Sequence, residues 1–209
     1  MHNYGLEQAD SYLDRQGYNN RMTRSLLQIL SFYMTLPVSI AYHEIGHGSR
    51  AIAYDGQARY GIGTDGGGQH QSYFELLLEL YTSPTNGAHV RYWGVSSVND
   101  QFNISANGVN NEMYLSSLIS DQLFSNQTDS VFNFLPYTYT KLSTSMYVSA
   151  EDRTNLLGGD LTEVEAYYRD NDIPVSKQDL SNYNIYAYLL SASTWQYWKG
   201  FRGYLRYYN

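Results

Sequence analysis

One five-residue segment, His43-Glu44-Ile45-Gly46-His47, combines the residue types of a zinc hydrolase at a suitable spacing. On a helix, side chains four residues apart project from the same face, so the two imidazoles can bind one zinc ion. Glu44 follows the first histidine, where a carboxylate can take a proton from a zinc-activated water and pass it to a leaving amine. The segment therefore predicts a zinc peptidase with His43 and His47 as metal ligands and Glu44 as general base.

A catalytic zinc usually has three protein ligands, and the chain contains no cysteine, so the third must be His, Asp or Glu. We expect Glu112 in this role, because Asn111-Glu112 lies at the start of an expected helix. This arrangement resembles the Asn-Glu pair that supplies the glutamate ligand of gluzincin-type peptidases. The alternative is an acidic residue in a first helical turn, where the helix dipole favours it. Asp121 on the same helix could orient a ligand histidine.

Two further histidines, His70 and His89, are alternative third ligands. His70 follows a triple glycine and could swing toward the zinc, although it does not fit the metzincin spacing. Lone loop histidines are usually exposed, so we expect both to lie outside the metal site. A tyrosine could stabilise an oxyanion, but the sequence does not choose among 23 tyrosines.

The segment that must position the motif is an uncharged apolar stretch from Ser25 to Tyr42. We expect one helix to run from it through the motif to Tyr54 and to stop at Asp55-Gly56. Pro37 should kink this helix or end its first half. At about 18 residues, the stretch is near the lower limit for a membrane span, and a buried core helix of a soluble domain is the alternative.

Residues 40–51, IAYHEIGHGSRA, resemble the first motif of site-2 protease-type intramembrane metallopeptidases, which carry HExGH inside a hydrophobic helix. The resemblance is limited to about residues 25–54. It implies a membrane-embedded zinc site with His43 and His47 as ligands and Glu44 as base. The second motif of that family, an Asn-Pro-Asp-Gly-like element that supplies an Asp ligand, is absent from this sequence.

The remaining sequence predicts a mainly α-helical bundle with the HExxH helix, a Gly-rich loop and one short strand. We treat residues 1–209 as a single domain, with an N-terminal helical part (1–55), the Gly-rich loop (55–71) and a helical remainder (72–209). Asn107-Gly108 is expected to form a turn. The expected elements after the loop are a helix over 72–82 capped by Ser72, a strand over 90–98, a helix from Asn110 or Asn111 to Phe124, a helix over 160–170 opened by a capping box, and a last helix from Ser176 or Asp179 that includes Trp195.

The amino-acid composition indicates which classes of partner to expect. The formal net charge is -7, so we expect no nucleic-acid partner. Only 16% of residues are charged, and the abundant tyrosines suit membrane or protein interfaces. We expect a peptide or protein substrate and a membrane location, with a soluble cytoplasmic protein as the alternative; a homo-oligomer is permitted.

Two other functions remain open at this point. One is a non-enzymatic, Tyr-rich membrane or assembly protein in which HExxH is fortuitous. The other is a metal-binding regulator whose site is closed by a fourth protein ligand.

Overall fold

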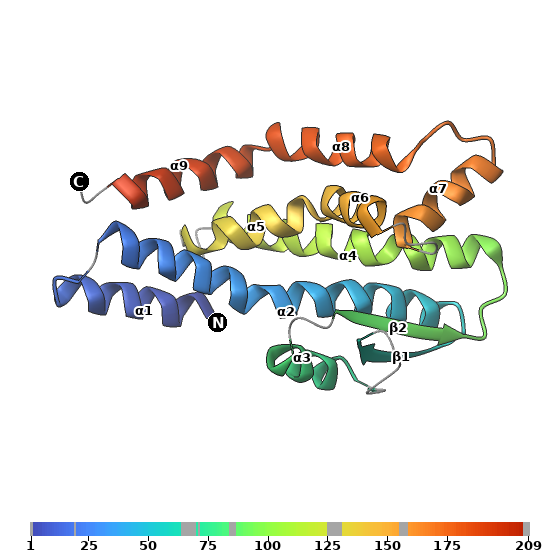
Figure 1. Ribbon diagram of the computed structural model, residues 1–209, viewed down its shortest axis with the longest axis horizontal. Helices are drawn as coiled ribbons and strands as arrows, with labels where there is room; N and C mark the ends of the chain where they lie inside the picture. Colours follow the sequence, from blue (N-terminus) through green and yellow to red (C-terminus); the bar gives the residue numbers. More distant parts are fainter. Residues whose placement is uncertain are drawn as a thin grey trace.

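The computed structural model describes residues 2–18, 20–63, 70, 72–83, 87–124, 131–154 and 159–206. It is mainly helical, as predicted, and its described part contains one two-stranded sheet (Figure 1). The helices are α1 (His2–Arg15), α2 (Arg21–Ala53), α3 (Tyr73–Thr82), α4 (Val98–Phe124), η1 (Val131–Asn133), α5 (Phe134–Lys141), α6 (Ser143–Thr154), α7 (Asp160–Asp170), α8 (Lys177–Leu189) and α9 (Ala192–Arg206), and the strands are β1 (Gln57–Ile62) and β2 (Ala88–Trp93).

The long helix α2 organises the fold. Figure 1 shows α1, α3 and the sheet below it, α4, α5 and α6 above it, and α8 and α9 as the uppermost layer. Its most extensive packing is against α4. The helix begins with a capping box, in which the Asn20 side chain accepts from the backbone N–H of Thr23 and the Thr23 hydroxyl accepts from that of Asn20. The prediction that Pro37 could end the first half is wrong, because this buried proline lies inside a continuous helix held by packing from several sides.

The buried face of α2 is largely polar. Six buried residues with polar or charged side chains recur every three or four positions: Arg24, Gln28, Ser31, Thr35, Ser39 and His43. Two of them bond across the packing interface: Gln28 Nε2 donates to the carbonyl of Val131 at 3.0 Å, and Ser31 Oγ donates to that of Phe132 at 2.7 Å. Backbone carbonyls of η1 therefore fix the position of α2.

The outer face of the first half of α2 is apolar instead. Met22, Leu26, Ile29, Leu30 and Tyr33 are exposed there. By length and composition alone, α2 could cross a membrane, and it is the one helix among the described residues that meets this criterion. Core helices of soluble proteins and signal sequences meet the same criterion, so this is weak evidence for a span.

Several expected boundaries need correction. Residues 57–62, expected to belong to the Gly-rich loop, form β1; residues 64–69 and 71 of that loop lie outside the described part of the chain. The second strand covers 88–93 and not 90–98. The expected helix over 110–124 begins at Val98, so Asn107-Gly108 is helical and not a turn. The last helix, expected to be continuous, is divided into two helices, because α8 ends at Leu189 and α9 begins at Ala192.

Candidate metal centre

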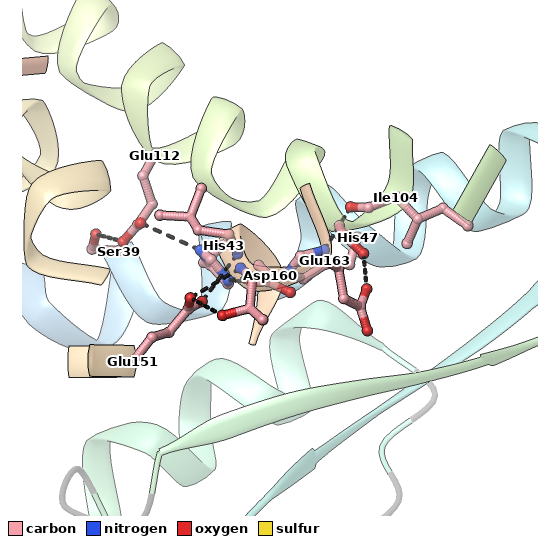
Figure 2. Close-up of polar contacts among 11 residues, drawn as sticks. Ser39, His43, His47, Ile104, Glu112, Glu151, Asp160 and Glu163 are labelled. Atoms are coloured by element: carbon pink, nitrogen blue, oxygen red, sulfur yellow. Dashed lines mark hydrogen bonds and ion pairs between the residues drawn. The ribbon is translucent and has the colours of Figure 1, made fainter. Parts of the chain in front are cut away.

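Three ligand-type atoms from two segments that are distant in the sequence lie close together (Figure 2). Nε2 of His43 and Nε2 of His47 lie 3.0 Å apart. One carboxylate oxygen of Asp160, Oδ2, lies 2.9 Å from the first and 3.1 Å from the second. Both histidines are buried, and the Asp160 side chain is 26% exposed toward solvent. The three atoms lie close enough together to share one cation.

The outward-facing nitrogens of the two rings have their own partners. Nδ1 of His43 lies 3.3 Å from Oε2 of Glu112, whose other oxygen accepts from Ser39 Oγ at 2.9 Å. Nδ1 of His47 donates to the backbone carbonyl of Ile104 at 2.7 Å. With Nδ1 as the donor, a neutral imidazole presents a lone pair at Nε2. Two such lone pairs and a carboxylate oxygen repel each other unless a proton or a metal cation lies among them, and this donor set is one that a divalent metal such as zinc fits.

Helix α4 holds the histidine helix in position at very short range. Asn107 Nδ2 donates to the carbonyl of Gly46 at 2.6 Å, and Asn111 Nδ2 donates to the carbonyl of Tyr42. Between these two asparagines, Gly108 lies directly against the imidazoles, because a Cβ there would lie 2.7 Å from Nε2 of His43. The glycine is therefore required by the histidines and marks no turn.

Asp160 is positioned by a carboxylate from α6. It is the first residue of α7, whose N-cap is Gly159 and has no side-chain cap. Glu151 supplies the cap: its carboxylate accepts from the backbone N–H groups of Leu161 and Thr162, both at 3.0 Å. The helix was predicted correctly. The capping box expected at its start, in which Asp160 would be the cap and Glu163 its partner, was wrong: Glu151 caps the helix, and Asp160 faces the histidines.

The sequence-predicted site residues divide into those that meet and those that do not. His43 and His47 converge as expected, and Glu44 is buried beside them. Glu112 is placed behind the His43 ring, on Nδ1, and is not a member of the three-atom group; the third position is held by Asp160, which the sequence analysis did not propose. His70 lies against Glu79 of α3.

An open cavity of about 410 Å³ gives access to the group. Glu44, His89 and Tyr147 line it together with the three candidate ligands. The Tyr147 ring stacks on His43 with centroids 4.5 Å apart and planes 4° from parallel. Burial raises the pKa of the Tyr147 phenol well above its ordinary value, so the phenol remains an O–H donor.

The charged groups of the centre are strongly coupled. Burial by itself lowers the pKa of His43, but hydrogen bonds with Asp160 and Glu112 raise it to about 10. The pKa of His47 is also raised, because its contact with Asp160 outweighs burial. Burial acts to raise the pKa of Asp160, yet its bonds to both histidines hold it below the ordinary value. Burial raises the pKa of Glu44, so this carboxylate holds a proton more readily than an exposed one.

The edge of β2 that faces away from β1 borders the same cavity, and among the described residues no other strand pairs with it. On the far side of β1, Tyr60 exchanges backbone hydrogen bonds with His70, so its N–H and C=O point away from β2. Val90 stands opposite Tyr60 in the antiparallel register, and its N–H and C=O therefore point away from β1. By alternation, Ala88 and Tyr92 also present their backbone groups at the free edge, and all three residues line the cavity.

No protein-family model matches this chain, and comparisons with curated proteins and with solved structures returned no match.

Proposed function

We propose that this protein is a zinc-dependent peptidase with His43, His47 and Asp160 as the metal ligands. The observation that carries the proposal is the convergence of two imidazole nitrogens and one carboxylate oxygen within 3.1 Å of one another, at the wall of an open cavity. Three ligands and an open side are typical of catalytic zinc and not of structural zinc. The pair of histidines and one aspartate also has the donor types implied by the site-2 protease resemblance, although Asp160 follows Gly158-Gly159 and not Asn-Pro.

The chain's own residues supply the proton transfers. Zinc, when bound, is a Lewis acid that polarises a carbonyl group and acidifies water. Glu44 lines the cavity next to the ligands, where its carboxylate takes the proton of the attacking water. It then returns that proton to the amine nitrogen as the peptide C–N bond breaks. Glu112 and the carbonyl of Ile104 keep both imidazoles in the tautomer that presents Nε2 to the centre.

The free edge of β2 supports a peptide as the substrate. An extended peptide can pair with the exposed N–H and C=O groups of Ala88, Val90 and Tyr92 as an added strand. Such pairing binds the main chain whatever its side chains are, and it would bring one peptide bond alongside the metal ligands.

The decisive experiment measures zinc and cleavage on the same preparations. We expect about one zinc per chain by elemental mass spectrometry, together with cleavage of a mixed fluorogenic peptide library. Glu44→Gln should retain the zinc and lose cleavage, whereas His43→Ala/His47→Ala should lose both. Wild-type protein that takes up no zinc from excess metal would overturn the proposal and favour a Tyr-rich assembly protein.

We further propose that the protein lies against a membrane through the first half of α2. The supporting observation is the inverted pattern of this helix, which buries polar side chains and exposes apolar ones such as Leu26 and Leu30. Helix α3 extends the apolar surface: Tyr81 donates to the carbonyl of Met34, and Phe74 and Leu78 are exposed on the same helix. A surface of this kind is unfavourable in water and favourable in a lipid interface.

A further inference from the structure

A second cavity, of about 230 Å³, adjoins the metal cavity. Tyr92 and Glu163 line both of them, so the two spaces share a wall. Tyr92 belongs to the strand whose free edge faces the metal centre. An extended peptide paired with β2 would therefore pass from the metal ligands to the mouth of the second cavity.

The walls of this second cavity are aromatic and acidic. Phe102 of α4 stacks on Tyr167 of α7, with ring centroids 4.0 Å apart and planes 20° from parallel. The Tyr167 hydroxyl donates to Asn99 at 2.9 Å, which fixes the ring. Glu163 and Asp170 lie on the same helix as Tyr167 and contribute two carboxylates.

The charge of the cavity is unbalanced. Among the described residues that line it, none is lysine or arginine. Arg169 pairs with Asp170 at 3.3 Å, but both side chains are about 70% exposed (73% and 69%), and such a surface pair contributes little. Glu163 accepts from the neutral Ser105 hydroxyl, and no ion pair joins it to another of the described residues.

We propose that this second cavity binds an arginine or lysine side chain of the peptide substrate. The inference rests on the proposed peptidase function and adds its specificity. Aromatic rings attract a cation and pack on its aliphatic stem, while a carboxylate of the lining, Glu163 or Asp170, binds its charged end. An acidic or short apolar side chain gains neither interaction there.

The test compares peptides that differ in one charge. Arginine and its neutral isostere citrulline are placed in turn at each position of an acetylated, amidated alanine hexapeptide. Dissociation constants are measured by calorimetry on zinc-loaded Glu44→Gln protein, in which the peptide stays intact. At one position we expect arginine to bind about 3- to 10-fold more tightly than citrulline, as for partly exposed ion pairs. At the same position, a peptide with lysine should bind more tightly than one with norleucine, its uncharged counterpart.

Variants then locate the effect. Glu163→Gln keeps an oxygen that accepts from Ser105, so it removes the charge with little change in shape. Glu163→Gln combined with Asp170→Asn should abolish the preference, whereas Glu7→Gln, which removes an exposed charge of α1 outside the cavity lining, should preserve it.

Equal binding of arginine and citrulline at every position would overturn the subsite. A preference that survives in the double variant, or no measurable peptide binding, would overturn it too. None of these results decides the proposed function, since zinc content and library cleavage test that separately.

Discussion

Gly108 of α4 touches the imidazole of His47, and no other residue type fits between the helices at this point. A Cβ at position 108 would lie 2.7 Å from Nε2 of His43 and closer still to Nε2 of His47. Gly108→Ala must therefore displace one ring or separate α2 from α4. We expect a loss of about 1–3 kcal/mol of stability, typical of overpacking, and at least a tenfold weaker zinc affinity, since either shift disturbs the arrangement of the ligands.

Chelator competition and denaturant unfolding measure the two effects. Gly203→Ala is the matched control, because a Cβ at Gly203 would meet nothing within 4 Å. That change lies in helix α9 and should leave zinc affinity unchanged while stabilising the protein by up to about 1 kcal/mol. Unaltered zinc affinity in Gly108→Ala would contradict the close contact.

The identity of the third ligand is tested by two carboxylates on opposite sides of His43. Asp160 meets both Nε2 atoms, whereas Glu112 meets only Nδ1. We expect Asp160→Asn to lose stoichiometric zinc, because an amide oxygen is a weaker, neutral ligand. Glu112→Gln should retain zinc with an affinity about 10- to 100-fold lower, as for partners that orient a ligand histidine. The reverse order of affinities would instead make Glu112 the ligand.

Glu151 is predicted to act on the metal through the start of α7. Its carboxylate accepts from two backbone N–H groups and from the Thr162 hydroxyl. Glu151→Ala leaves these donors without their cap, so we expect a loss of about 1–3 kcal/mol in unfolding free energy and weaker zinc binding.

The neighbouring Asp152→Ala is the control. It removes only the ion pair with Lys177, in which the Asp152 side chain is 52% exposed, and should cost under about 1 kcal/mol with zinc affinity unchanged. Equal effects of the two variants on zinc affinity would show that capping by Glu151 does not position Asp160.

The sequence was most informative where the chemistry is local. His43, Glu44 and His47 lie within one helical turn, so their spacing alone predicted a shared face. The third position of the metal group was missed because Asp160 lies 113 residues beyond His47 and meets it only through tertiary packing. Its local pattern, an Asp three residues before a Glu, also fits a capping box.

Gly108 carried a signal that was misinterpreted. An Asn-Gly pair usually marks a turn, but here the glycine permits contact with the imidazoles and Asn107 bonds to the carbonyl of Gly46. Small and amide residues at positions 107, 108 and 111, one helical turn, indicate close helix packing once the partner helix is known. The sequence alone does not name that partner.

The apolar outer face of α2 predicts where the protein meets lipid. Leu26 and Leu30 are 53% and 48% exposed, one turn apart, on the face that points away from the buried polar residues. Replacing both by Gln removes apolar area worth more than about 1.4 kcal/mol if they insert, which is at least a tenfold loss of partitioning. Flotation with vesicles of phosphatidylcholine and phosphatidylglycerol measures this partitioning.

A second pair of exposed leucines, in another layer of the fold, is the control for this double substitution. Leu189 and Leu190 are 46% and 82% exposed at the end of α8, in the uppermost layer of Figure 1, away from α2. Their replacement by Gln should leave flotation unchanged, because lipid that contacts α2 does not reach them. A wild-type protein that stays with the soluble fraction would refute membrane attachment. Equal losses of flotation in both double variants would mean that exposed apolar residues bind the vesicles non-specifically. The outer face of α2 would then not be the membrane-binding surface.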